Sequence, residues 1–257
     1  MPSYQDSRFF FYLYSHKIFF WFFLVFFALQ IFFWHKTENI KPILEIVPPA
    51  PSKYFTAAAS LGDKEFLFRA LATELQNSGD VFAGFVALKK YDYSRIYQWM
   101  TALDQLNSKS NFTPSLAAYI YSQTQKTEDT KYIVNYLVEH SSTDIDRNWW
   151  WLFQAIYIAK NNLGDMNRAL EISYFLSENN SPNAPFWTKQ MPAFIYAEMG
   201  DGCMAFQIIQ KIITESENGT RQINPEELNF MRYFIQSRLQ KLKEGKFDPK
   251  TCPQTKL

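Results

Sequence analysis

The stretch Leu163-Gly164-Asp165-Met166-Asn167-Arg168-Ala169-Leu170 recurs 36 residues later as Met199-Gly200-Asp201-Gly202-Cys203-Met204-Ala205-Phe206. Each copy has Gly-Asp at an expected turn and Ala five positions after the Gly. A small residue at that position lets one helix approach its partner closely. Units of this kind bury their apolar faces only by stacking on neighbouring units. The recurrence therefore predicts a repeat architecture.

Apolar residues on both sides of these stretches also follow a helical spacing. The predicted helices cover residues 63–77, 80–90, 92–107, 114–125, 129–140, 147–163, 166–178, 185–199, 203–217 and 225–244. Candidate N-caps are Asp63, Asp92, Asp146 and Asn224. Pro192 is expected either to kink its helix or to delay the start of that helix. The predicted fold class is all-α, with one N-terminal transmembrane helix followed by an α-solenoid of stacked antiparallel helix pairs.

A third turn of the same kind stands upstream at Ser78-Gly79-Asp80, where Gly84 is the small residue. Farther along, the chain resembles the second half of a tetratricopeptide repeat. The residues that match the family pattern are Gly164, Asp165, Ala169 and Pro182, followed by Ala193 and Tyr196 ahead of Gly200. This resemblance covers about a third of the chain.

The resemblance implies a concave groove that binds a protein or peptide, without chemistry of its own. A period of 36 residues, against about 34 in the family, leaves a divergent repeat and a generic α-solenoid both open. The overall style of the sequence favours a bacterial, membrane-anchored protein.

Residues 18–34 form one apolar block near the N-terminus, bounded by Lys17 and by the His35-Lys36 pair. About 17 helical residues span about 25 Å, which a slightly thinned bilayer accommodates. The segment after the block has no small-x-small cleavage site, which favours an uncleaved anchor over residues 18–36. The flanking charges do not decide the orientation.

Residues 37–60 form a linker that contains Pro42, Pro48, Pro49 and Pro51. These prolines favour an extended strut that holds the folded domain away from the lipid. In the alternative, a strap packs on the domain through Ile43, Leu44, Ile46 and Val47. The remaining predicted parts are a short N-terminal tail (1–17), a tetratricopeptide-like repeat domain (61–244) and a C-terminal tail (245–257).

Charge and motif content argue against most chemistry. The 26 basic and 25 acidic residues leave no strong field for nucleic acid. His140 is the only histidine of the predicted domain, where we expect it at a helix end, so a paired-histidine zinc motif and a Ser-His-Asp triad cannot be assembled. We therefore expect no catalytic residue, metal or cofactor.

The run Arg147-Asn148-Trp149-Trp150-Trp151 is the most unusual part of the predicted domain. Helical spacing predicts a core stripe of Trp149, Leu152, Phe153, Ile156 and Leu163. A second stripe lies about 100° away. We predict that this stripe lines a partner-binding groove formed by Trp150, Gln154, Tyr157, Asn161, Trp187 and Gln190. The alternative is that neighbouring helices bury both stripes.

Cys203 and Cys252 are the two cysteines of the chain. A disulfide between them would join the C-terminal tail to the last full repeat and would indicate an oxidising compartment. Two unpaired cytosolic thiols are the alternative.

Together these features predict a membrane-anchored scaffold or assembly factor that binds another protein, in a membrane or envelope complex, through a helical-repeat groove. We expect a single-pass protein of the bacterial inner membrane with a periplasmic domain. The alternatives are an enzyme that acts on an envelope polymer through carboxylates in the groove, and an adaptor that faces the cytosol.

Overall fold

A computed structural model describes residues 4–38, 45–81, 84–179, 183–219, 222–239 and 252. The chain divides into two compact units, Met1–Glu45 and Ile46–Leu257. Among the described residues, the regular structure is helical apart from one hairpin of two short strands.

The first unit contains a single long helix, α1 (Tyr4–Thr37). Within it, the 20-residue segment Ile18–Thr37 is long and apolar enough to cross a membrane, and none of this segment is buried by other parts of the chain. The helix begins well before the apolar block, since residues of the predicted N-terminal tail already belong to it.

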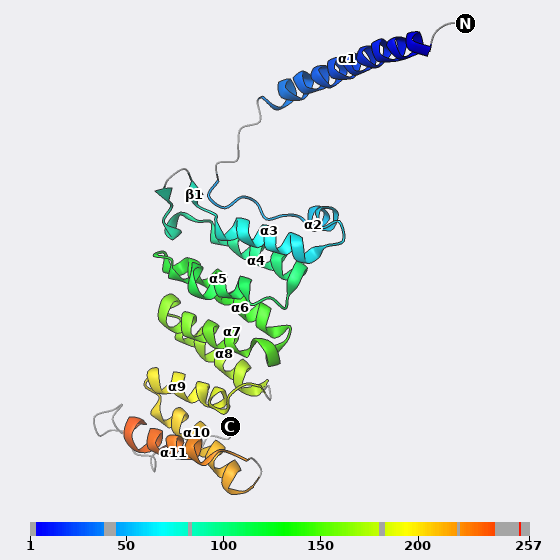
Figure 1. Cartoon of the computed structure of the whole chain (residues 1–257). Helices are drawn as coiled ribbons and strands as arrows, with labels where there is room; N and C mark the ends of the chain where they lie inside the picture. Colours follow the sequence, from blue (N-terminus) through cyan, green and yellow to red (C-terminus); the bar gives the residue numbers. More distant parts are fainter. Residues whose placement is uncertain are drawn as a thin grey trace. The chain divides into compact units, whose positions relative to one another are not determined.

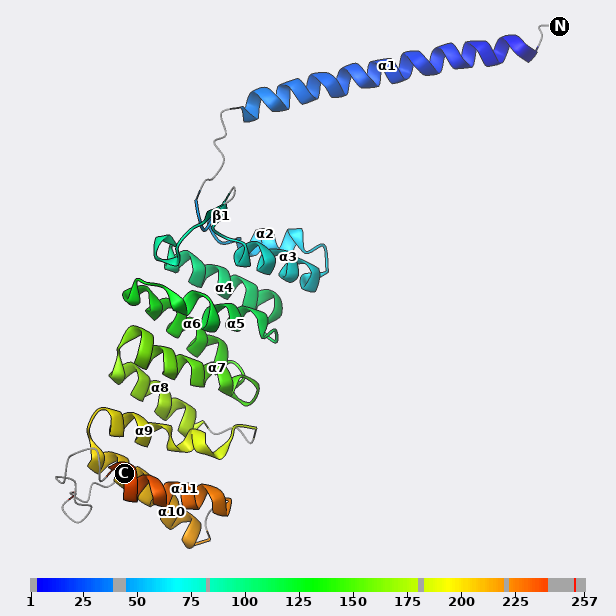
Figure 2. The same cartoon turned by 60° about the vertical axis from the view of Figure 1, so that its left-hand side comes forward.

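The second unit is a series of helices stacked in the order of the sequence (Figures 1 and 2). The helices are α2 (Lys53–Ala59), α3 (Lys64–Gln76), α4 (Tyr93–Asn107), α5 (Phe112–Tyr119), α6 (Thr130–Ser142), α7 (Ile145–Ile158), α8 (Met166–Glu178), α9 (Met191–Glu198), α10 (Gly202–Glu217) and α11 (Pro225–Tyr233). From α6 to α10, each helix packs on the next.

Short elements join these helices. They are the antiparallel pair β1 (Asp80–Val81) and β2 (Gly84–Phe85), and the helical turns η1 (Leu88–Lys90), η2 (Tyr121–Gln123), η3 (Thr127–Asp129), η4 (Ala159–Leu163), η5 (Phe186–Gln190) and η6 (Phe234–Leu239). The η4 and η6 turns are π-helical and continue α7 and α11.

The two copies of the recurrent stretch build the same turn. Gly164 and Gly200 have φ values of 75° and 84°, in the left-handed region that favours glycine. The next residue in each copy, Asp165 or Asp201, caps the following helix, because its carboxylate accepts the backbone N–H three residues on, at 2.9 and 3.0 Å. Each motif therefore ends one helix and starts the next.

A nearly continuous apolar core follows the stack. One cluster runs from Val47 to Ile195, and a second lies between α9, α10 and α11. Ala169 and Ala205, the small residues of the two recurrent stretches, are fully buried. Their size allows close helix approach, as the sequence predicts.

Tyrosine hydroxyls close the upper end of this core. Tyr121 Oη donates to the carbonyl of Leu75 at 2.7 Å, and Tyr93 Oη donates to the carbonyl of Tyr121 at 2.7 Å. Tyr91 Oη donates to the carbonyl of Ser78 at 2.6 Å. Two of these bonds tie carbonyls at and just after the end of α3 to residues farther along the chain, and the third ties the start of α4 to η2.

The linker contains a strap, not a free strut, at residues 46–50. Val47 is buried, and its carbonyl accepts a hydrogen bond from Arg95 Nη1 at 3.0 Å. Trp99 Nε1 donates to the carbonyl of Pro48 at 2.8 Å. An extended proline-rich backbone leaves its carbonyls unpaired, and α4 supplies the donors. The earlier linker residues Pro42, Ile43 and Leu44 lie outside the described residues.

Three other sequence predictions need correction. Residues 80–90 do not form a helix, because Asp80 pairs with Phe85 across the hairpin and a short helical turn follows. The cap of α7 is Asp144, not Asp146. Residues 37–60 were predicted to be linker, but they contain the helix α2, which begins after the cap residue Ser52. Pro192 delays the start of the α-helix, since α9 begins one residue before it, after η5.

The predicted disulfide between Cys203 and Cys252 is present, with the two Cα atoms 5.3 Å apart. It joins the first turn of α10 to a chain position 49 residues later. The rest of the predicted C-terminal tail lies outside the described residues, as do Pro182 and residues 240–244 of the last predicted helix.

Candidate functional site

A surface cavity of about 390 Å³ lies between α7 and α9. We call it the aromatic groove. Its lining residues are Phe153, Ile156, Tyr157, Lys160, Trp187, Met191, Phe194, Ile195 and Glu198.

The spacing of the lining residues explains how two helices build one groove. Along the chain from α7 into η4, they stand at positions 153, 156, 157 and 160, and α9 contributes positions 191, 194, 195 and 198. Both sets follow the spacing i, i+3, i+4, i+7, which keeps side chains on one face of a helix. Each helix therefore turns one stripe toward the same cavity.

One end of the groove is aromatic. The ring centroid of Trp187 lies 5.0 Å from that of Phe153 and 6.0 Å from that of Trp149, in edge-to-face geometry. Trp150 packs beside Phe153 at 5.4 Å, and its Nε1 donates to Tyr119 Oη at 3.0 Å. Such ring pairs are favourable beyond the area that they bury, so they hold Trp187 in place.

The other end of the groove is charged. Lys160 Nζ lies 2.8 Å from Glu198 Oε2, and both side chains are partly exposed. Phe153 approaches Trp187 at one end and Lys160 approaches Glu198 at the other, so α7 and α9 run in the same direction. Seven residues separate Phe153 from Lys160, a distance of about 10 Å along a helix.

The structure brings together some of the predicted partner-binding residues. Tyr157 and Trp187 line the groove, and Tyr157 is 53% exposed. Trp150 is exposed at the rim, beside Phe153. Asn161 is also exposed, but its amide donates to the Tyr157 carbonyl at 2.9 Å and does not line the cavity.

Two of the predicted residues have other surroundings. Gln190 is completely buried, so its assignment to the groove surface is wrong. Gln154 is half-buried and does not line the cavity. An amide side chain on an inner helix can be exposed or can be covered by a neighbouring element. Its spacing in the sequence is the same in both cases, so spacing alone does not predict which occurs.

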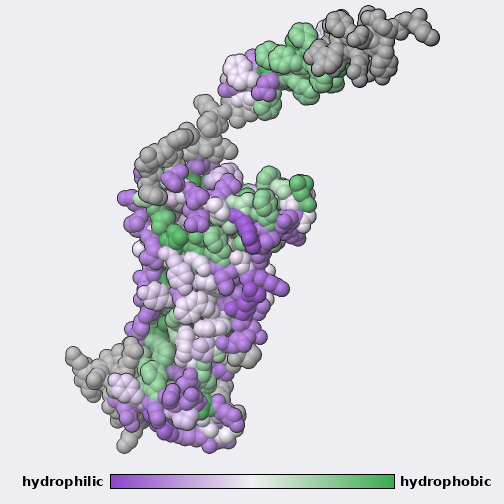
Figure 3. Space-filling model, in the orientation of Figure 1, coloured by the Kyte–Doolittle hydropathy of each residue, from purple (hydrophilic) through white to green (hydrophobic). Residues whose placement is uncertain are grey.

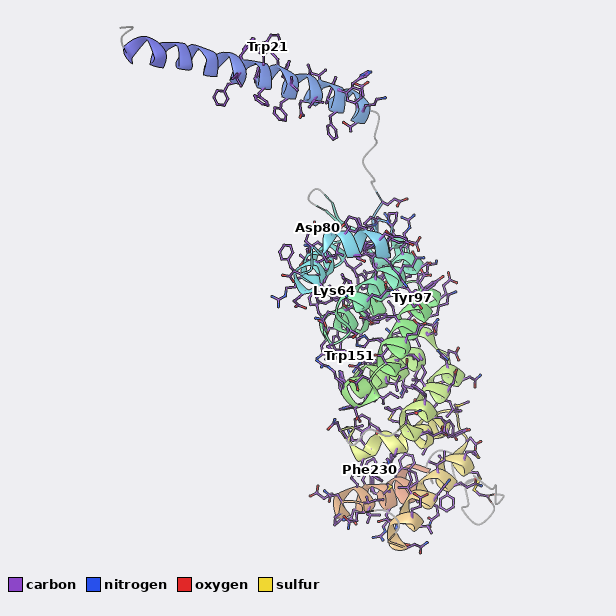
Figure 4. All side chains as sticks on the ribbon, turned by 90° about the vertical axis from the view of Figure 1, so that its right-hand side faces the viewer. Trp21, Lys64, Asp80, Tyr97, Trp151 and Phe230 are labelled. Atoms are coloured by element: carbon purple, nitrogen blue, oxygen red, sulfur yellow. A yellow bond between two sulfur atoms is a disulfide. The ribbon has the colours of Figure 1, made fainter. Side chains whose placement is uncertain are left out.

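Phe153 and Trp149, two residues of the predicted core stripe, are only partly buried. Both pack against the core, and Phe153 also lines the groove. The buried tryptophan is instead Trp151 (labelled in Figure 4), whose Nε1 donates to Asn111 Oδ1 at 3.1 Å. Leu152 and Ile156 are buried, as predicted.

Sequence reasoning missed Lys160 and the whole α9 stripe of the groove, Met191, Phe194, Ile195 and Glu198. A signal for them exists in the sequence. The apolar i, i+3, i+4 pattern of Phe153, Ile156 and Tyr157 recurs 38 residues later, close to the repeat offset.

A buried polar network lies elsewhere in the stack. His140 Nδ1 is 2.7 Å from Asp104 Oδ2, and Tyr136 Oη donates to Asp104 Oδ1 at 3.0 Å. Burial raises the pKa of Tyr136, and the neighbouring Asp104 carboxylate adds to that effect. His140 is thus a buried residue that ties α6 to α4, not a plain helix-end residue. Among the described residues, no three His, Cys, Asp or Glu side chains gather as metal ligands would.

Comparison of this chain with known protein families, with curated proteins and with solved structures finds no match. What can be stated of its class comes from the fold: a helical protein with one N-terminal helix able to span a membrane, and with a disulfide that is typical of an oxidising compartment.

Proposed function

We propose that this protein is a membrane-anchored scaffold or assembly factor that binds another protein through the aromatic groove. The observation that carries the proposal is the pair of parallel stripes on α7 and α9, with exposed aromatic side chains around a cavity. Tryptophan and tyrosine dominate the binding energy of many protein interfaces, because they bury a large area with few rotatable bonds.

The chemistry of the groove indicates what the partner presents. The Trp187 end fits a large apolar side chain, and the Lys160–Glu198 end fits a polar or charged group about 10 Å away. A short peptide segment with one apolar anchor meets both requirements. A segment of a folded protein is therefore a better candidate than a small metabolite.

The repeat character of the stack supports the same proposal. We interpret the second unit as an α-solenoid of tetratricopeptide-like helix pairs, because the Gly-Asp turn and the buried Ala recur in two successive pairs. In such folds the first helix of each pair lines one continuous surface. α7 and α9 stand in that relation, and they share the groove.

The proposed location is the bacterial inner membrane, crossed once by α1, with the second unit in the periplasm as part of an envelope complex. The disulfide supports this side of the membrane, since thiols in the cytosol are kept reduced. A phosphatase reporter fused to the C-terminus should be active, and a fluorescent protein that matures only in the cytosol should stay dark. The reverse pattern would exclude the periplasmic location.

Site-specific photo-crosslinking tests the groove. A benzoylphenylalanine at position 157 of the full-length chain, in its native membrane, should give a discrete crosslinked product. The same group at Glu171, an exposed position on α8, serves as the matched control and should give none.

Trp187→Ala should reduce the yield of the position-157 product at least about fivefold, since truncation of a central aromatic anchor commonly costs more than about 1 kcal/mol of binding. A thermal melt of the same variant separates lost binding from lost folding. Equal crosslinking from positions 157 and 171 in a folded protein would exclude the groove as the binding surface.

A further inference from the structure

The beginning of the second unit carries a separate apolar surface, which we call the α2 patch. Figure 3 shows this surface over α2. Its members are large apolar side chains on α2, on the turn after it and on the first turn of α3: Tyr54, Phe55, Leu61 and Phe66. Tyr54 is 90% exposed and Leu61 is 93% exposed. Side chains of this size are rarely gathered in the open without a function.

Within the described residues of the second unit, the packing of α2 leaves the α2 patch uncovered. The helix has seven residues, and none of them is buried. Helices shorter than about 12 residues are marginal in water, and most gain their stability by burying an apolar face. Here the Ser52 hydroxyl caps the helix, accepting the Phe55 N–H at 3.2 Å, but no face of the helix is covered.

The backbone at Leu61 points the same way. Its φ is 45°, and it is the only non-glycine residue with positive φ among those described. Leucine is disfavoured there because its Cβ crowds the backbone, whereas the next residue, Gly62, has a φ of 92° without that cost. An apolar side chain that is both strained and exposed is a reason to look for a ligand.

We propose that the α2 patch inserts into the surface of the phospholipid bilayer that α1 spans. Eight peptide units connect Glu38, which follows α1, to Ile46, where the strap begins to pack on the second unit. An extended residue spans at most about 3.6 Å, so this connection reaches at most about 29 Å. Because α2 follows the strap directly, its aromatic residues are kept within reach of the lipid surface.

The side chains of the α2 patch suit the headgroup region. Tyrosine, phenylalanine and leucine enter the boundary between headgroups and acyl chains, and nearby lysines contact lipid phosphates. Lys53 and Lys64 flank the patch as the first residues of α2 and α3, and Lys64 is labelled in Figure 4. Of the neighbouring carboxylates, Asp63 caps α3 and Glu65 pairs with Arg69. This surface is separate from the aromatic groove, so either proposal can fail alone.

Depth-dependent fluorescence quenching tests the proposal. The full-length chain carrying Leu61→Cys, with its native disulfide intact, is labelled with the environment-sensitive dye NBD. It is then placed in nanodiscs of phosphatidylethanolamine and phosphatidylglycerol at a ratio of about three to one, with or without lipids that carry a doxyl quencher. The control is the same label at Tyr233→Cys, an exposed apolar position on α11.

We expect the doxyl lipids to quench the label at position 61 at least twofold more than the label at position 233. Phe55→Ser combined with Phe66→Ser should bring the quenching at position 61 down to the control level. A label at Tyr54→Cys repeats the test if the Leu61 variant does not fold. Equal quenching at positions 61 and 233 would overturn the proposal. So would a blue-shifted emission at position 61 without quenching, which would mean that a protein covers the patch.

Discussion

Three consecutive tryptophans on α7 have three different surroundings. Trp149 packs edge-to-face on Trp187, Trp150 is exposed at the groove rim, and Trp151 is buried with its indole N–H bonded to Asn111. Successive residues of a helix point about 100° apart, so the same residue type can occupy a packing, an exposed and a core position in turn.

Trp151→Ala should lower the free energy of unfolding by about 3 to 5 kcal/mol, since it empties a core site and leaves Asn111 without its donor. Trp150→Ala should cost much less stability, because its side chain is 38% exposed. Thermal melts of the two variants in the same detergent provide the comparison. An equal loss in both would mean that Trp150 is also a core residue.

Tyr93 gives the stability a dependence on alkaline pH. Burial raises its pKa from the ordinary 10 to about 12. Below pH 10 the phenol is neutral in both the folded and the unfolded chain, and in the folded chain it donates to the Tyr121 carbonyl. Between pH 10 and 12 the unfolded chain releases this proton while the folded chain keeps it, so stability falls as the pH rises.

Tyr93→Phe should therefore flatten the fall of the thermal midpoint between pH 10 and 12. At pH 7 the same substitution should cost about 1 kcal/mol, because the Tyr121 carbonyl loses its donor. Tyr97, whose pKa burial also raises to about 12, remains in both proteins and cancels in the comparison. Parallel pH profiles for the two proteins would argue against this role of Tyr93.

The turn at Gly79, after α3, and the turn at Gly164, after η4, differ in the space around the glycine. Gly79 and Gly164 both have positive φ, so alanine is strained at either position, at about 1 to 2 kcal/mol. At Gly79 the added Cβ would also overlap Tyr91 Oη, whereas at Gly164 it would meet open space. Gly79→Ala should therefore lower the thermal midpoint more than Gly164→Ala. Equal losses would show that Tyr91 moves aside freely.

Most helix starts of this fold can be predicted from the sequence, because a cap is a local interaction. The Asp63, Asp92 and Asn224 side chains each accept a backbone N–H of the helix that follows, as predicted. The hairpin after Gly79 cannot be predicted from local sequence, since its pairing depends on strand geometry and on tertiary packing around Tyr91. α2 was not predicted for a different reason. A helix without a buried face has no apolar residues at helical spacing that mark a core-facing side.

The groove is predicted only in part, for a reason that belongs to inner helices. Such a helix contacts neighbours on two sides, so two adjoining faces are apolar and spacing cannot say which faces solvent. The sequence correctly predicts that Tyr157 and Trp187 line the groove. Phe153, predicted as core, packs against the core and also lines the groove, and Gln190, predicted to lie at the groove surface, is buried. The interaction that closes the groove, between Lys160 and Glu198, joins residues 38 positions apart.

For the molecule as a whole, the disulfide should determine how the C-terminal end responds to reduction. In the chain-entropy model, a closed loop of this length contributes roughly 4 kcal/mol. Cys203 and Cys252 both pack against the apolar cluster of α9, α10 and α11. Reductant should thus lower the midpoint at which this part unfolds, and leave the larger cluster nearer its original midpoint.

Cys252→Ser should reproduce that shift and remove the response to reductant. Hydrogen exchange with and without reductant locates the change along the chain. A uniform loss of protection from α3 to α11 would mean that the second unit unfolds as one cooperative body.

The order of the stack also has a kinetic consequence. Each helix packs mainly on elements close to it in the sequence, so a chain that emerges N-terminus first can dock each helix soon after synthesis. At a synthesis rate of about 5 to 20 residues per second, the apolar face of a new helix is exposed for only a few seconds before the next helix packs on it. Cys203 is the exception, since its partner follows 49 residues later. We therefore expect the covalent bond to form last, around a stack that is already assembled.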